Sequence, residues 1–182
     1  MKRNFIANLN GKTTHFVLLG IFITLIWTNS AFAQTEKEVV KIRADVAAIN
    51  KGAAKYTKIL KDIEDISLEG AEATYYHLAG KVKKITTEML GETFNSTGEL
   101  YYKDRQLIFA FIKRRQYDTQ IGVEPPPKVV DTQEQRLYFA ADGRLIRLLI
   151  GKKESKTVDE NYSRLEKEVS HISRKLMDSY LD

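Results

Sequence analysis

The sequence predicts an exported α+β protein with a long N-terminal helix, an antiparallel meander sheet of about six strands and a C-terminal helix. Three observations predict it: a secretion signal at the start of the chain, helical apolar spacing in two bracketing segments, and a repeated aromatic hairpin motif between them. The expected organisation is a signal peptide over residues 1–33 and a single exported α+β domain over residues 34–182.

The signal consists of basic residues, a 12-residue apolar run over residues 16–27, and the small-residue motif Ala31-Phe32-Ala33. The run is shorter than the roughly 20 residues that a membrane-spanning helix needs. We therefore predict cleavage between Ala33 and Gln34, a periplasmic or secreted location, and no membrane span after cleavage. A retained signal anchor is the alternative.

Composition narrows the classes of partner and cofactor. The chain has no cysteine, which excludes disulfides, thiol nucleophiles and thiolate metal sites. Of 29 Lys and Arg residues, Lys2, Arg3 and Lys12 belong to the signal, so the exported chain carries 26 against 24 acidic residues. With a net charge of only about +2 left, nucleic acid is not an expected partner.

The first predicted helix covers residues 35–64. Thr35 and Glu38 match the capping box, in which hydroxyl and carboxylate bond each other's backbone amides. The apolar residues then follow a 3-4 spacing: Val39, Ile42, Val46, Ile49, Ala53, Tyr56, Leu60 and Ile63. Gly52 interrupts this stripe and weakens the helix by about 1 kcal/mol relative to alanine.

The second predicted helix covers residues 158–180. Thr157 and Glu160 again match the capping box, and a second apolar stripe runs from Val158 to Tyr180. Both stripes are expected to face the sheet or each other within one domain. The alternative is an oligomer that pairs through helices 35–64 and 158–180.

A repeat lies between the helices. Residues 75–85 align without gaps on residues 138–148 as Tyr-aromatic-x-x-x-Gly-basic-aliphatic-x-basic-aliphatic, and residues 100–109 form a third copy that is one residue shorter. Each copy is an aromatic strand, a polar turn and an aliphatic strand, which predicts a β-hairpin. Pro125-Pro126-Pro127 cannot donate to a ladder and marks a long loop between residues 116 and 131.

Residues 72–150 resemble a known group. Gly91-Glu92-Thr93, Glu99-Leu100-Tyr101-Tyr102, Leu107-Ile108-Phe109 and Glu134 to Arg147 are similar to segments of small exported bacterial proteins of the Bacteroidetes type, whose function is unassigned. The resemblance implies a periplasmic or secreted location and an antiparallel sheet. It carries no catalytic residue to this chain.

No catalytic, cofactor or metal motif is present. His77 and His171 are not at metal-ligand spacing from each other or from a carboxylate pair. The carboxylates of Asp62, Glu64 and Asp65 are expected to be a solvated end of the first helix, and Lys113-Arg114-Arg115 a solvated strand end. We therefore expect no cofactor and no metal, and we expect an enzyme only if the fold assembles scattered residues into a site.

The predicted binding residues come from strand alternation. Tyr76, Leu78, Leu100, Tyr102, Leu137 and Phe139 are expected on the face that the helices cover. The opposite face would carry Tyr75, His77, Tyr101, Lys103, Arg136 and Tyr138. A tyrosine row edged by cations suits a glycan or a peptide; alternatively these tyrosines only pair across strands.

The sequence thus favours a non-catalytic binding or interaction module of the cell envelope, with a glycan, peptide or protein as partner. An enzyme with a fold-assembled site and a structural protein that oligomerises through its terminal helices are the alternatives.

Overall fold

The computed structural model describes residues 14–64, 66–67, 69–157 and 159–181. Its contacts divide the chain into two compact units at Glu38/Val39, and the second unit contains the whole sheet. The elements are α1 (Thr14–Lys51), a 3-10 turn (Ala53–Lys55), β1 (Thr57–Asp62), β2 (Ala71–Leu78), β3 (Lys81–Gly91), β4 (Phe94–Lys103), β5 (Gln106–Tyr117), β6 (Val129–Phe139), β7 (Leu145–Ile150), β8 (Lys153–Ser155) and α2 (Glu160–Leu181).

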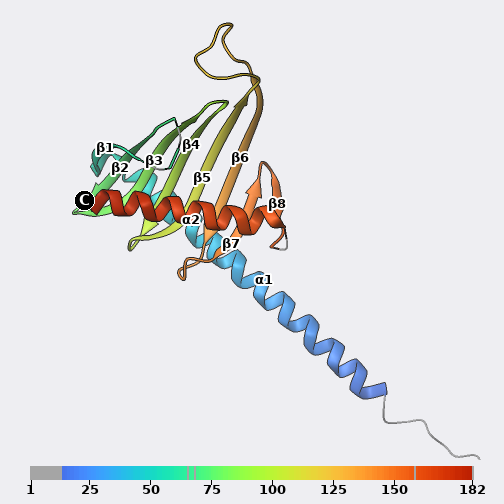
Figure 1. The fold of residues 1–182 in the computed structure, drawn as a ribbon. Coiled ribbons are helices and arrows are strands. Elements are labelled where there is room, and N and C mark those ends of the chain that lie inside the picture. Colours follow the sequence, from blue (N-terminus) through green and yellow to red (C-terminus); the bar gives the residue numbers. More distant parts are fainter. Residues whose placement is uncertain (1–13, 65, 68, 158, 182) are drawn as a thin grey trace, which may run out of the picture. The chain divides into compact units, whose positions relative to one another are not determined.

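The strands form one antiparallel meander in the order β1 to β8, with every strand paired to its neighbours in sequence (Figure 1). The three predicted hairpins are confirmed as β2–β3, β4–β5 and β6–β7. The expectation of about six strands is too low, because β1 and β8 extend the sheet at its two edges.

Two of the hairpins have two-residue turns that fix their register. Ala79 and Gly80 connect β2 to β3, and Asp104 and Arg105 connect β4 to β5; all four residues have positive φ. Two successive residues with positive φ are typical of the type I′ turn, whose twist matches that of the strands. On β2 and β4, the strands before these turns, the face of a residue therefore follows from its distance to the turn, whereas on β3 and β5 a bulge close to the turn shifts the register by one residue.

The predicted boundaries of the first helix are wrong at both ends. α1 continues through Thr35 from Thr14 and ends at Lys51, so the cleavage bond Ala33–Gln34 lies within it. Gly52 follows the helix, where a Cβ atom would lie 2.7 Å from the Tyr56 hydroxyl. β-Branched residues then favour the strand β1 over a continued helix.

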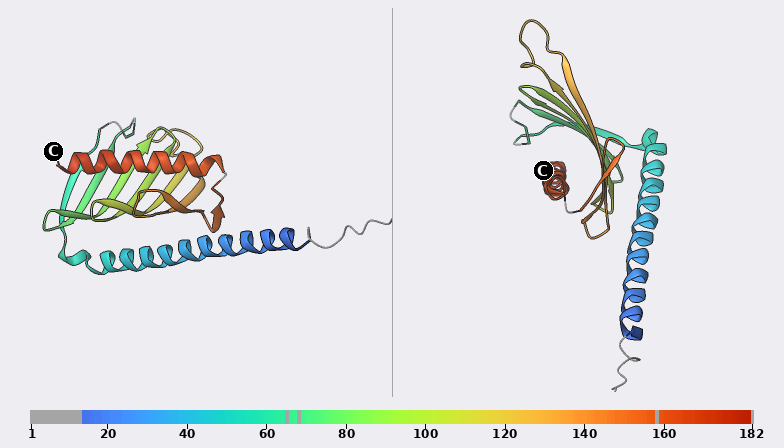
Figure 2. Two further views of the ribbon diagram at one scale, coloured as in Figure 1. Left: turned by 90° about the horizontal axis from the view of Figure 1, so that it is seen from below. Right: turned by 90° about the vertical axis from the view of Figure 1, so that its right-hand side faces the viewer.

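The second helix, α2, covers one face of the sheet, here called the α2 face (Figure 2). Its buried residues are Tyr162, Leu165, Val169, Ser173 and Leu176. Asp159, rather than the predicted Thr157, caps its N-terminus, since its Oδ1 accepts the backbone N–H of Asn161 at 3.0 Å. The Tyr75 hydroxyl donates to the Leu176 carbonyl at 2.9 Å and fixes the helix to β2.

The C-terminal part of α1, residues 39–51, packs on the opposite face, here called the α1 face. Val39 and Ile42 are buried there against Tyr138, with Phe109 and Leu149 around them. Val39 and Ile42 of the first apolar stripe are therefore buried within the chain, as is the core-facing stripe of α2. Pairing between copies through these helices stays an alternative prediction. Within the described residues, no helix is both long enough and apolar enough to cross a membrane.

Candidate functional site

The six predicted binding residues do not share a face. Tyr101, Lys103, Arg136 and Tyr138 lie on the α1 face, in register from β4 to β6. Tyr75 lies on the α2 face beneath Leu176, and His77 packs against Tyr180 of α2, with ring centroids 5.6 Å apart. The expectation of one open row is therefore wrong for the residues of β2.

The turns explain this error. Tyr76 and Tyr101 each lie three residues before the first residue of a two-residue turn, whereas Tyr75 lies four residues before it. The structural equivalent of Tyr101 is thus Tyr76 and not Tyr75. The sequence repeat aligned the first aromatic residue of each pair, but side-chain direction follows the register from the turn.

An aromatic row does cross the α1 face. It runs in register through Tyr76, Lys84, Tyr101, Phe109 and Tyr138. Its cations stack on its rings: the Lys84 ammonium lies 4.9 Å from the Tyr101 ring centroid. Phe109 and Tyr138 have ring centroids 4.9 Å apart. These contacts make the row a cross-strand packing feature.

Residues 39–51 cover this row. The Tyr101 hydroxyl donates to the Asn50 Oδ1 at 3.1 Å, and the Lys103 ammonium pairs with Asp45 at 2.8 Å. Tyr101 is 2% exposed and Tyr138 is 5% exposed. Burial raises the pKa of Tyr101 above its usual value. The row is therefore not available to a glycan or peptide while the helix is in place.

Beyond this helix, the α1 face is open and carries an unusual row of charges. Asp62 of β1, Glu72 of β2 and Glu88 of β3 are direct cross-strand partners, so their side chains leave the same face next to one another. All three are exposed. Like charges opposite each other on neighbouring strands destabilise a sheet. The charges of the carboxylate row thus oppose the pairing of β1, β2 and β3.

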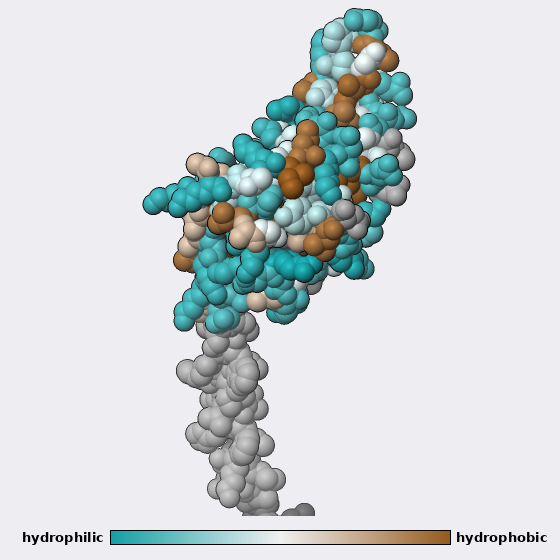
Figure 3. Space-filling model, turned by 90° about the vertical axis from the view of Figure 1, so that its left-hand side faces the viewer, coloured by the Kyte–Doolittle hydropathy of each residue, from teal (hydrophilic) through white to brown (hydrophobic). Residues whose placement is uncertain are grey.

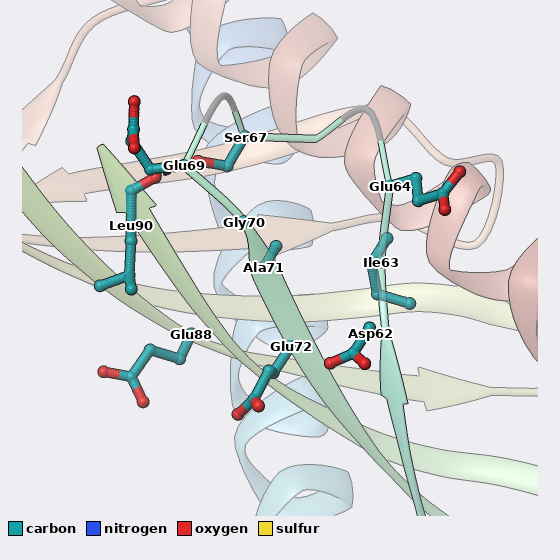
Figure 4. Close-up of a pocket in the computed structure, with 10 residues that line it drawn as sticks. All are labelled: Asp62, Ile63, Glu64, Ser67, Glu69, Gly70, Ala71, Glu72, Glu88 and Leu90. Carbon is teal, nitrogen blue, oxygen red and sulfur yellow. Dashed lines mark hydrogen bonds between the residues drawn. The ribbon is translucent and has the colours of Figure 1, made fainter. Parts of the chain in front are cut away.

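A cleft of about 780 Å³ lies at this row (Figure 4). Five carboxylates line it, none of its described lining residues is basic, and Ser67, Glu69 and Gly70 before β2 form part of its lining. Its lining residues are Asp62, Ile63, Glu64, Ser67, Glu69, Gly70, Ala71, Glu72, Glu88 and Leu90. The hydroxyl of Ser67 donates to the Leu90 carbonyl and connects the loop to β3.

A second cleft of about 310 Å³ continues along the open face and shares Glu72 and Glu88 with the first. It adds apolar surface from Leu60 of β1, which is 65% exposed, and from Phe111 of β5. It also adds Glu99, whose carboxylate is paired with Lys84 at 3.1 Å. The two clefts together offer negative charge beside apolar side chains.

The first cleft lies beside an open sheet edge. β1 pairs with β2 on one side only, so part of its backbone N–H and C=O groups are free to pair with another chain. Its two lysines do not occupy the cleft. Lys61 donates to the Ser179 carbonyl on the α2 face, and the Lys58 ammonium lies 5.3 Å from the Tyr76 ring centroid at the other end of the strand.

Sequence reasoning missed this site because it placed Asp62 and Glu64 at the solvated end of a helix. Asp62 instead ends a strand, and register brings it next to Glu72 and Glu88. Asp65, the third member of that predicted cluster, lies outside the described residues. Across the described part of the chain, no group of three or more His, Asp or Glu side chains is arranged to hold a metal ion.

Two buried polar groups have no hydrogen-bond partner within the described structure. They are the Thr87 hydroxyl and the ring nitrogens of His77. Thr87 lies on the α2 face, where its hydroxyl occupies the space above Gly98. Thr87 also borders the second cleft, but its hydroxyl is on the opposite face from the carboxylate row, and His77 does not line either cleft.

Comparisons with family models, with curated proteins and with solved structures find no match to this chain.

Proposed function

We propose that this protein is an exported, non-catalytic binding module of the cell envelope, and that it binds an extended cationic segment of a polypeptide along β1. The carboxylate row formed by Asp62, Glu72 and Glu88 carries the proposal. A positively charged ligand would reduce the repulsion between these carboxylates, and this reduction would contribute favourably to the binding free energy.

The open edge of β1 accounts for the extended conformation. A polypeptide that adds to a sheet edge gains main-chain hydrogen bonds, and alternate side chains then point to one face. On the α1 face, one side chain of such a segment would lie next to Asp62, at the end of the carboxylate row, and the one two residues away would lie next to Leu60. Lysine or arginine suits these positions, because the charged group reaches a carboxylate while the aliphatic stem covers an apolar side chain such as Leu60.

Export and envelope location rest on the signal at residues 1–33 and on the resemblance to small exported bacterial proteins. An exported chain meets its partners outside the reducing cytosol, where the lack of cysteine has no cost for a domain of this size. The aromatic row contributes packing to this function rather than ligand contacts, since residues 39–51 cover it.

The test is isothermal titration calorimetry with three nine-residue peptides. A peptide of alternating lysine and valine should bind, and the same peptide with glutamate for lysine should not. A third peptide, with proline in place of every valine, keeps the charge but lacks the N–H groups that edge pairing needs. It should bind at least tenfold more weakly than the first, and binding should weaken further at high salt.

A matched pair of double variants tests the site. Asp62→Asn with Glu72→Gln removes two charges from the row, whereas Asp104→Asn with Asp131→Asn removes two exposed charges elsewhere. We expect the first variant to bind the lysine peptide at least tenfold more weakly and the second to bind it as the wild type does. An equal loss of affinity in both variants would show that only net charge matters, and no loss in the first variant would show that the row is not used; either result would refute the site.

A further inference from the structure

A groove runs along the C-terminal half of α2, between this helix and the hairpin turns of the sheet. A cavity of about 390 Å³ lies between the end of α2 and the β2–β3 and β4–β5 turns. A second cavity of about 240 Å³ shares Arg105 and Met177 with it and continues toward the β6–β7 turn. Small-molecule sites commonly occupy about 300–1,000 Å³, so the joined groove has a suitable size.

The floor of the groove is apolar. In the first cavity it consists of Val82, Met177 and Tyr180, and in the second of Leu107 and Phe139. Methionine adapts its shape to an irregular apolar ligand, because its side chain is unbranched and flexible. This floor suits a single hydrocarbon chain better than a polar or a flat ligand.

The rim of the first cavity is cationic. Lys81 and Lys83 from β3 and Arg105 from the β4–β5 turn line it, against a single carboxylate, that of Asp104. At the second cavity, Arg174 adds a cation and Asp178 adds a carboxylate. An apolar floor below a cationic rim is complementary to an amphiphile with an anionic head.

Within the described residues, Lys81, Lys83 and Arg105 bond no carbonyl group at the end of α2, whereas Arg174 donates to the Ser170 carbonyl of that helix at 3.4 Å. Lysine and arginine near the end of a helix commonly bond its last carbonyl groups. Here the sheet supplies donors instead: Tyr75 bonds the Leu176 carbonyl and Lys61 bonds the Ser179 carbonyl. Lys81, Lys83 and Arg105 therefore remain at the rim, where an anion can reach them.

One wall of the first cavity also borders an unused polar group. The ring of Tyr180 lies 5.6 Å from that of His77, centroid to centroid, and both nitrogens of His77 lack a partner within the described chain. A buried polar group without a partner is unusual in a folded protein. The wall beside Tyr180 thus holds a donor and an acceptor that the fold does not use.

We propose that this groove binds an anionic amphiphile with one acyl chain, of the fatty-acid class. The carboxylate head meets Lys81 and Arg105, and the chain lies on Val82, Met177 and Tyr180. This site is on the α2 side of the sheet and takes a ligand of opposite charge to that of the carboxylate row. The test of this site is therefore independent of the test of the peptide site.

The test is calorimetric titration with dodecanoate below its micelle concentration, with dodecanol as the uncharged control of equal chain length. Dodecanoate should bind with one site per chain and dodecanol at least tenfold more weakly. The variant Lys81→Gln with Arg105→Asn should weaken dodecanoate binding at least tenfold. Asparagine is chosen at position 105 because the residue there has a φ of 68°, which asparagine tolerates.

Two controls make the result decisive. Lys152→Gln with Lys153→Gln removes two exposed cations from the β7–β8 turn and should leave dodecanoate binding unchanged. Met177→Gln keeps all charges and should weaken dodecanoate binding if the acyl chain lies on the floor. Equal binding of dodecanoate and dodecanol, equal losses in both lysine variants, or no binding at all would each overturn the proposal. The lysine peptide should bind all these variants as it binds the wild type.

Discussion

Truncation of two adjacent tyrosines, one at a time, tests the register of β2. Tyr75 is fully buried on the α2 face, where its hydroxyl bonds Leu176 at 2.9 Å and its ring lies 5.4 Å from that of Tyr180, centroid to centroid. Tyr76 is half-buried on the opposite face beside Lys58. Truncation to alanine should therefore have very different effects at these two positions.

The magnitudes follow from the contacts. Tyr75→Ala should lower the free energy of unfolding by about 3–5 kcal/mol, the usual range for truncation of a buried aromatic side chain. Tyr75→Phe removes only the hydrogen bond to Leu176 and should cost about 0.5–1.5 kcal/mol. Tyr76→Ala removes partly solvated contacts and should cost about 1 kcal/mol.

The assay is urea unfolding followed by circular dichroism, with the slope of free energy against urea compared between variants. Tyr75→Ala should also lower the Tm by about 10 °C, given roughly 2–4 °C per kcal/mol for a chain of this length. A loss at Tyr76 as large as that at Tyr75 would refute the assigned faces. A reversed order, with the larger loss at Tyr76, would support the tyrosine row that the sequence predicted.

Three further predictions concern other parts of the chain. Thr87→Val should raise the free energy of unfolding by about 1–2 kcal/mol in the same assay, because it removes a buried hydroxyl that has no partner; a loss of stability would show that the hydroxyl is bonded. Burial raises the pKa of Tyr162 to about 12 and that of Tyr102 still further. The unfolded chain releases these protons near pH 10 and the folded chain retains them, so stability should fall as the pH rises from about 10 to about 12. Tyr162→Phe should make this fall shallower in urea unfolding, and an unchanged pH profile would contradict the assignment. The intact mass of the exported chain should correspond to an N-terminus at Gln34, free or cyclised, and the chain should show no tryptophan fluorescence. A product that retains Ala33 would disprove the predicted cleavage.

The fold was largely predictable from local signals. The repeat of aromatic strand, turn and aliphatic strand predicted three hairpins, and apolar spacing predicted α2. β1 was missed because the residues from Tyr56 to Ile63 fit both a helical stripe and a strand, and a short apolar run cannot separate the two. Two features favour the strand: Gly52, which follows the end of α1, and the edge of β2 with which β1 pairs. Only the second of these depends on the rest of the fold.

The candidate site was much less predictable. Asp62, Glu72 and Glu88 are separated by ten and sixteen positions, and no spacing rule connects them. They meet only because two successive registers align them across three strands. The turn after Leu78 and the bulge next to it set the second of these registers, and an error of one residue there moves every side chain of the strand to the other face.

The meander order also has a consequence for how the chain reaches its folded state. Because every strand pairs with the strand next to it in sequence, the sheet grows by short loop closures, and such local topologies fold quickly. The contacts that close the structure are distant in sequence: Tyr75 meets Leu176 across 101 residues, and Arg43 meets Tyr138 across 95. A chain that becomes available from its N-terminus onward, as during synthesis, can thus pair its strands in their order of appearance, and α2, the last element, then covers one face of the finished sheet.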